Sequence, residues 1–217
     1  MEPDALARLR EQRLVAVIRA PDAGSAVGAA RAVAAGGVRI VEITFTVPGA
    51  AEAMATLKDD PGLTVGAGTV LTAAQARIAL AAGARFLIAP NLSREVAAEA
   101  AAAGALFCPG AYTTSEIIAA RDAGAHVVKV YPVGVAGGPA YIRIIRDPLP
   151  DVPLLAAGGT TLENVAQFLE AGCVGVGLGA ALADPALAGA GQFDELTRRA
   201  RAFVGRLEEA GLRAARS

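Results

Sequence analysis

Two ionisable side chains of opposite charge interrupt apolar segments of this chain. Lys129 lies within the run Val127–Tyr131, and Glu42 lies within the run Arg39–Phe45. A buried ammonium group is costly unless it is paired or loses its proton. A neutral amine in a dry pocket is a nucleophile that can form an imine with a carbonyl compound. Lys129 is one of only two lysines among 20 basic residues, so the chain uses lysine sparingly, and arginine cannot do this chemistry.

Both charges also have structural explanations. A lysine at a strand end can extend its ammonium group to water, and Glu42 with Lys129 can form a buried ion pair. Apolar residues often replace such pairs without loss of stability, so the presence of both charges favours a functional site. Arg19 and Thr69, each at the end of a strand-like segment, add to that interpretation, because perturbed ionisable groups gather at functional sites. Arg19 could equally reach solvent, and Thr69 could cap a helix.

The alternation of side chains along a strand predicts which residues share a face. It places Glu42, Thr44 and Thr46 on one face of the second predicted strand. It places Lys129 and Tyr131 together on one face of the sixth. We therefore expect one acid and one amine to face a common interior.

An alanine-rich stretch followed by Ala-Gly and then by an apolar strand recurs along the chain, which is typical of a helix that ends at a left-handed glycine. The glycines are Gly36, Gly83, Gly104, Gly124 and Gly172. Eight strands are predicted, at Leu14–Ile18, Arg39–Phe45, Thr64–Gly68, Phe86–Ala89, Leu106–Cys108, Val127–Tyr131, Pro153–Ala156 and Val174–Leu178. Capping boxes at helix starts are predicted for Thr72 with Gln75, Thr113 with Glu116 and Thr160 with Glu163.

Eight strand–helix units with short connections and apolar strands predict an α/β fold, a (β/α)8 TIM barrel that forms a single domain over residues 1–217. An open doubly wound sheet is the structural alternative. It is disfavoured because no Gly-x-Gly-x-x-Gly sequence opens a helix after the first strand.

The composition excludes several classes of function. The net charge of −1 gives no electrostatic reason to expect nucleic acid, and no apolar run of about 18 residues suggests a membrane span. The two cysteines lie in apolar segments, which favours a reduced, cytoplasmic location over a disulfide framework. The single histidine weighs against a histidine-based metal site or a Ser-His-Asp triad.

Glycines follow the last two predicted strands. Gly158 and Gly159 come after the seventh strand, and Gly179 comes after the eighth. Exposed backbone N–H groups at such positions bind anions, and in this fold the loops after strands seven and eight often bind phosphate. Tight turns in a small barrel would explain the same glycines.

Several segments together resemble the class I pyruvate aldolases that cleave 2-keto-3-deoxy-6-phosphogluconate (KDPG) and 4-hydroxy-2-oxoglutarate (KHG). The resemblance covers nearly the whole chain. It is carried by residues 35–44, by residues 65–70, by Lys129 with its flanks up to Pro132, and by Ile88-Ala89-Pro90 and Cys108-Pro109-Gly110.

The resemblance implies a metal-independent lyase of carbohydrate metabolism, in the Entner–Doudoroff pathway, without a cofactor. It implies Lys129 as the imine-forming residue, Glu42 as the base, and Thr69 and Pro90 at the substrate. Gly158 and Gly159 would then lie near a phosphate. The products would be pyruvate with glyceraldehyde 3-phosphate from KDPG, or pyruvate with glyoxylate from KHG. A homotrimer is also implied.

Three positions depart from the family pattern. Thr46 stands where many members have an arginine that holds the substrate carboxylate, and Arg19 is a candidate replacement. Ala157 and Ala180 stand where threonine and serine are frequent. Both a phosphorylated and a non-phosphorylated keto acid therefore remain open as substrate. The rival functions are a sugar-phosphate epimerase or isomerase, whose metal-dependent forms need several histidines, and a non-catalytic barrel that binds a keto acid.

Overall fold

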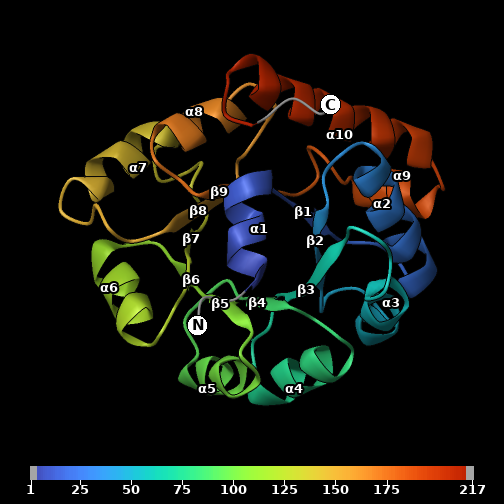
Figure 1. Cartoon of the computed structure of the whole chain (residues 1–217), viewed down its shortest axis with the longest axis horizontal. Helices are drawn as coiled ribbons and strands as arrows, with labels where there is room; N and C mark the ends of the chain where they lie inside the picture. Colours follow the sequence, from blue (N-terminus) through green and yellow to red (C-terminus); the bar gives the residue numbers. More distant parts are fainter. Residues whose placement is uncertain (1–3, 214–217) are drawn as a thin grey trace.

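The computed structural model describes residues 4–213, and their strands form one parallel sheet in the order β5-β4-β3-β2-β1-β9-β8-β7-β6. Helices surround this sheet on the outside (Figure 1). The prediction of a single (β/α)8 barrel is confirmed for the described residues. The strands are β1 Leu14–Ile18, β2 Ile40–Thr44, β3 Thr64–Gly68, β4 Phe86–Ile88, β5 Leu106–Cys108, β6 Gly110–Ala111, β7 Val128–Val130, β8 Leu154–Ala157 and β9 Gly175–Leu178.

The ring closes through one stretch of chain that is divided into β5 and β6. Cys108, at the end of β5, is in register with β4, and Gly110, at the start of β6, is in register with β7. Pro109 separates the two segments and has no N–H group to give to the ladder. Its carbonyl still accepts a hydrogen bond from the Lys129 N–H (2.9 Å). The fifth predicted strand, Leu106–Cys108, therefore corresponds to β5, and the barrel strand continues beyond Pro109 as β6.

The barrel has two apolar cores, one on each side of the strands. The outer core joins side chains such as Val41, Ile43 and Val128 to the surrounding helices. The inner core includes Val15, Ile40, Phe86, Leu106 and Leu155, together with Ala5, Leu6 and Leu9 of the first helix. That helix, α1 (Asp4–Gln12), lies across the centre of the ring in Figure 1 and covers the amino ends of the strands.

Nine further helices occur within the described residues. They are α2 Ala23–Ala35, α3 Ala50–Leu57, α4 Ala73–Ala81, α5 Arg94–Ala103, α6 Thr114–Asp122, α7 Pro139–Arg146, α8 Val165–Glu170, α9 Pro185–Gly189 and α10 Phe193–Glu209. The Thr72 and Thr113 side chains accept hydrogen bonds from the backbones of Gln75 and Glu116, and Glu116 completes a capping box. Both predicted helix starts are thus confirmed.

The helix start predicted at Thr160 is wrong. The Thr160 hydroxyl donates a hydrogen bond to the Gly177 carbonyl (2.7 Å) and is buried, so it is not available to cap a helix. The α8 helix begins five residues later, at Val165. Thr160 instead ties the loop after β8 to β9.

Four of the five predicted helix-ending glycines have a positive φ, and Gly36 is the exception. Gly36 has φ −80°, and the following Gly37 takes the left-handed position. A Cβ at Gly36 would lie 2.4 Å from the Ala200 Cβ. Gly36 is therefore required by the close packing of α2 against α10.

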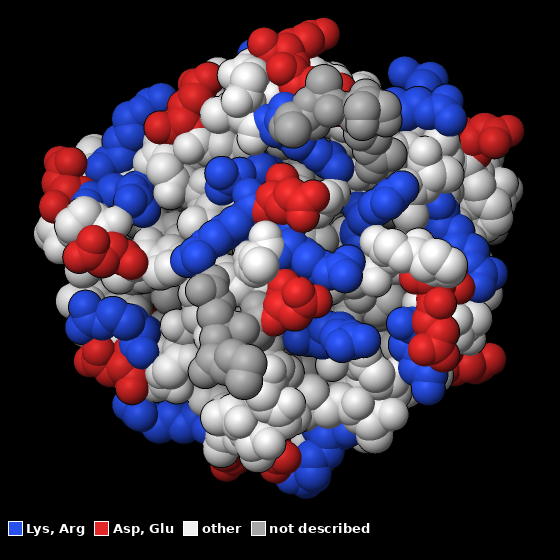
Figure 2. Space-filling model, in the orientation of Figure 1, with Lys and Arg blue, Asp and Glu red and all other residues white. Residues whose placement is uncertain are grey.

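The face of the molecule that α1 covers carries interspersed acidic and basic side chains (Figure 2). Lys, Arg, Asp and Glu side chains alternate over it without forming one extended basic surface. Within residues 4–213, no helix is long and apolar enough to span a bilayer.

Candidate active site

Glu42 on β2 and Lys129 on β7 both lie within the barrel. Glu42 is 1% exposed and Lys129 is 6% exposed. Their strand neighbours Val41, Ile43 and Val128 pack outward against the helices, so the period-two alternation turns the two charged side chains inward. The structure thus places one carboxyl group and one amine in an interior that is otherwise largely apolar.

The Glu42 side chain depends on a glycine in the neighbouring strand. A Cβ at Gly68 of β3 would lie 2.0 Å from Glu42 Oε1 and 2.5 Å from its Cδ. Any side chain at position 68 would therefore displace the carboxyl group. Glu42 Oε1 is buried and has no hydrogen-bond partner within the protein. Leaving such an atom unpaired costs about 1–3 kcal/mol, which is typical of a group whose partner is a ligand.

Cys108 lies within electrostatic reach of both charged residues. Burial raises the pKa of the Cys108 thiol to about 12, while nearby Lys129 opposes this rise and Glu42 adds to it. Among the described residues, no ion pair joins Glu42 to Lys129 within 4.0 Å. We call Glu42, Gly68, Cys108 and Lys129 the reactive half of the site.

A cavity of about 530 Å³ opens above Lys129 at the carboxyl ends of the strands. This size is within the range of small-molecule sites, about 300–1,000 Å³, and the position is where barrel enzymes carry their active sites. Five of the predicted site residues besides Lys129 line it, namely Arg19, Tyr131, Gly158, Gly159 and Gly179. The remaining lining residues are Val17, Ala157, Thr160, Gly177, Ala180 and Ala181.

Tyr131 follows the end of β7, one residue beyond the strand, and its ring lies beside the amine. The Lys129 Nζ is 5.0 Å from the centre of the Tyr131 ring, which is within the range of a cation–π contact. The ring also fills the space over Gly158, where a Cβ would lie 3.0 Å from Tyr131 Cδ2. Tyr131 therefore forms a wall between the amine and the loop after β8.

Two loops form the other side of the cavity, residues 158–160 after β8 and residues 179–181 after β9, and we call them the anion loops. The Arg19 guanidinium lies next to the second, because a Cβ at Gly179 would be 3.6 Å from Arg19 Nη1. Arg19 is exposed and has no hydrogen bond or ion pair to another described residue. A positive charge thus borders the cavity from the residue that follows β1.

Five predicted site residues do not line the cavity: Glu42, Thr44, Thr46, Thr69 and Pro90. The Thr44 hydroxyl donates to the Ile18 carbonyl (3.1 Å), and it is 2.6 Å from the Thr46 hydroxyl. If Thr44 gives its proton to Ile18, Thr46 is the donor of this second bond. The Thr46 hydroxyl then offers lone pairs only, which do not suit a substrate carboxylate.

Thr69 and Pro90 are half-buried at the ends of β3 and β4. Thr69 has φ 55°, a left-handed conformation that is rare for a β-branched residue and costs about 1–3 kcal/mol. Such strain is found mainly at functional sites. Their contact with substrate stays a prediction.

Two residues of the reactive half were not singled out from the sequence. In the sequence, Cys108 stands out only as a cysteine in an apolar segment and as part of Cys108-Pro109-Gly110, and Gly68 only as the end of the third predicted strand. The alternation of side chains along a strand could have indicated that both residues face inward. Cys108 lies two residues after the inward-facing Leu106, and Gly68 lies two residues after Gly66.

The fold and this cavity define a class, that of (β/α)8 barrel proteins with a buried amine at the carboxyl ends of the strands. The model of the family "KDPG and KHG aldolase" matches residues 6–199. The chain belongs to this family of aldolases, and it is accordingly a lyase.

Individual relatives agree with that assignment. The chain is 36% identical over 201 residues to the 2-dehydro-3-deoxy-6-phosphogalactonate aldolase of Escherichia coli (strain K12), covering 91% of this chain and 95% of the relative. It is 37% identical to a 2-dehydro-3-deoxy-phosphogluconate aldolase of Treponema pallidum (strain Nichols), covering 76% and 78% of the two chains.

A solved structure with a similar fold is the KDPG aldolase from Legionella pneumophila with pyruvate captured at low pH as a covalent carbinolamine intermediate. It aligns with a TM-score of 0.85 and 27% identity, over 94% of this chain and 98% of that one. The relatives favour an aldolase over the epimerase and the non-catalytic binding protein considered above.

Proposed function

We propose that this protein is a class I aldolase that cleaves 2-keto-3-deoxy acids, such as KDPG and KHG, through an imine at Lys129. The observation that carries the proposal is the buried Lys129 amine, which lines the cavity, while the same barrel interior holds the buried Glu42 carboxyl group with an unpaired oxygen. A pyruvate carbinolamine in a related solved structure supports the same chemistry.

The amine and the carboxyl group would act in succession. Lys129 attacks the C2 ketone, and the resulting carbinolamine loses water to give a protonated imine. Glu42, directly or through a water molecule, accepts the C4 hydroxyl proton as the C3–C4 bond breaks. The aldehyde leaves, and the bonding electrons form an enamine with the imine carbon. Protonation at C3 and hydrolysis then release pyruvate and restore the amine.

The cavity provides for the rest of the substrate. A phosphate or carboxylate distant from C2 would lie at the anion loops, near the Arg19 guanidinium and Gly179. KDPG would yield glyceraldehyde 3-phosphate, and KHG would yield glyoxylate. The Tyr131 ring would lie beside the positively charged imine, where a cation–π contact stabilises it.

Borohydride reduction in the presence of pyruvate tests the mechanism. We expect a stable pyruvyl adduct on Lys129, located by peptide mapping. The exposed Lys58 is the internal control, because it is the only other lysine in the chain. An adduct on Lys58 alone, or no adduct, would refute the mechanism. Activity that persists in a chelator would separate the aldolase from a metal-dependent epimerase.

We also propose a homotrimer located in the cytoplasm. The family resemblance supports the trimer, and exposed apolar side chains such as Leu71, Ile78, Val135 and Ile144 offer surface for subunit contacts. Two free, buried cysteines are in keeping with a reducing compartment. Light scattering after size-exclusion chromatography would test the trimer, and a monomer mass would contradict it.

A further inference from the structure

Three carbonyl groups in the anion loops are each held by a donor outside the cavity lining. The donors differ in kind: one is a backbone N–H, one is a side-chain amide and one is a guanidinium. The pairs are Gly134 N to Gly158 O (2.7 Å), Asn164 Nδ2 to Gly159 O (2.9 Å) and Arg199 Nη1 to Ala180 O (3.3 Å).

Fixing a carbonyl also fixes the N–H of the next residue. The peptide unit is planar and trans, so the two groups point in opposite directions. The N–H groups that follow the three carbonyls belong to Gly159, Thr160 and Ala181, and all three residues line the cavity. None of these N–H groups donates a hydrogen bond to another described residue. Three unpaired donors therefore lie on the cavity side of the loops.

We propose that Asn164 and Arg199 are positioning residues, which orient the N–H groups of Thr160 and Ala181 toward the anionic end of the substrate. This inference rests on the proposed function, because it concerns the phosphate-bearing end of the same substrate. Neither side chain lines the cavity, and both act through the backbone that they hold.

The side chains of the loops cannot take over this task. The Thr160 hydroxyl already donates to Gly177, and Ala157, Ala180 and Ala181 have no polar side-chain atoms. Within the loops themselves, backbone N–H groups are therefore the available donors, with the Arg19 guanidinium beside them. Because an anion contacts such N–H groups only when they point at it together, its affinity depends on how firmly each peptide plane is held.

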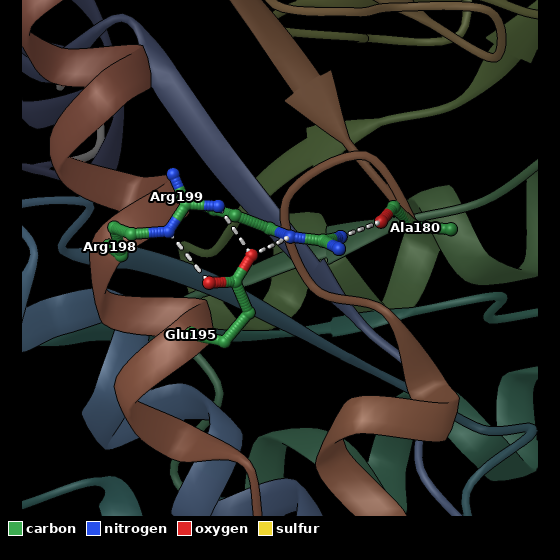
Figure 3. A network of polar contacts seen from close by, with 4 residues as sticks. All are labelled: Ala180, Glu195, Arg198 and Arg199. Atoms are coloured by element: carbon green, nitrogen blue, oxygen red, sulfur yellow. Dashed lines mark hydrogen bonds and ion pairs between the residues drawn. The ribbon is translucent and has the colours of Figure 1, made fainter.

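Arg199 is itself held in place by an acid on the same helix (Figure 3). Its Nε donates to Glu195 Oε1 (3.0 Å), which leaves Nη1 for the Ala180 carbonyl. Arg198 donates to the same carboxyl group through Nε (2.7 Å) and Nη2 (2.6 Å) but does not contact the loop. Hydrogen bonds from both arginines lower the pKa of Glu195 to about 2, so Glu195 stays ionised at neutral pH.

This geometry supplies a matched pair of variants. Arg199→Ala removes one positive charge, one bond to Glu195 and the bond to Ala180. Arg198→Ala removes one positive charge and bonds to the same Glu195 but leaves the loop untouched. A difference between the two variants therefore reports on the loop contact and not on the charge of α10.

The experiment measures kcat and KM with a phosphorylated 2-keto-3-deoxy acid and with the same acid lacking the phosphate. We expect Arg199→Ala to raise KM for the phosphorylated acid about tenfold, as for the loss of one charge-assisted hydrogen bond. We expect kcat for the phosphorylated acid to change less than about twofold. For the acid without phosphate, kcat and KM should both stay near their wild-type values. The inhibition constant of inorganic phosphate should rise in parallel with KM.

Asn164→Ala tests the loop after β8 in the same way, since it releases the Gly159 carbonyl. Should this variant unfold, the arginine pair decides the question alone. Equal effects of Arg198→Ala and Arg199→Ala, a KM increase for both substrates, or no change in KM would each overturn the inference. So would a wild-type protein that inorganic phosphate does not inhibit.

Pyruvate trapping separates this inference from the proposed function. Pyruvate carries no phosphate, so the Lys129 adduct should form equally well in wild type and in Arg199→Ala. Failure of trapping in the wild-type protein would refute the aldolase mechanism. Normal trapping with an unchanged KM in Arg199→Ala would refute only the role of the positioning residues.

Discussion

The two sides of the cavity are built by different means. The reactive half uses side chains on strands: Glu42 and Lys129 project inward from β2 and β7 and are almost completely buried. The anion loops use backbone groups, and side chains outside the cavity hold that backbone. The comparison indicates that rigid, dry surroundings suit the proposed imine chemistry, whereas the proposed anion recognition depends on correctly oriented peptide groups.

Loss of Lys129 should have the largest effect of any single substitution. Lys129→Ala removes the nucleophile, and we expect activity to fall by about 10⁴-fold or more because the covalent route is lost. Coupled detection of pyruvate release measures this effect. Lys58→Ala is the control and should retain activity. Substantial turnover by Lys129→Ala would show that the reactive half does not act through an imine.

Glu42→Gln should separate the proton transfer from imine formation. We expect kcat to fall by about 10³-fold, as for loss of a general base, while borohydride still traps pyruvate on Lys129. The glutamine side chain has nearly the same volume as glutamate, but its amide cannot act as a base. The variant therefore tests the proton-accepting role of Glu42 and not its packing. Equal losses of turnover and trapping would contradict the division of labour between the two residues.

Gly68→Ala should disturb the reactive half without removing any of its functional groups. The new Cβ would lie 2.0 Å from Glu42 Oε1, so the carboxyl group must move. We expect kcat to fall by about 10²-fold, less than in Glu42→Gln, because the base is displaced and not lost. Gly205→Ala on α10 is the matched control, since its Cβ would have no neighbour within 4 Å. A Gly68→Ala enzyme with normal kcat would show that the position of Glu42 is not critical.

The sequence predicts the reactive half better than the anion loops. Strand periodicity is local, so a charge inside an apolar run such as Val127–Tyr131 is enough to indicate an inward-facing Lys129. The barrel itself follows from the repeated strand–helix unit. The glycines of the anion loops were also visible, because they follow directly after predicted strands.

The contacts that hold the anion loops are not visible in the sequence. Arg199 reaches Ala180 from a helix 19 residues away in the chain, and nothing in its surroundings on α10 distinguishes it from Arg198. The spacing of Thr160 from Glu163 predicts a helix start, but the tertiary bond to Gly177 determines the role of Thr160. Contacts of this kind depend on the assembled barrel and not on local pattern.

The smallest expected effect concerns the protonation of the Cys108 thiol in the reactive half. The Cys108 thiol, whose pKa burial raises to about 12, should stay protonated in the folded protein while the unfolded thiol ionises near pH 9. The thiol therefore stabilises the fold fully below pH 9. This contribution is lost as pH rises toward 12, at about 1.4 kcal/mol per pH unit.

Cys108→Ala should remove this pH-dependent loss of stability. The free energy of unfolding in urea should therefore fall less between pH 9 and pH 10 in the variant than in wild type. Cys173→Ala is the matched control, because burial also raises the pKa of Cys173 to about 12, but it lies in the outer core. Both variants should reduce the pH dependence by a similar amount, whereas only Cys108→Ala alters the packing beside Glu42 and Lys129. If Cys108→Ala and wild type lose stability in parallel, water reaches the Cys108 thiol, and the reactive half is not the dry compartment that distinguishes it from the anion loops.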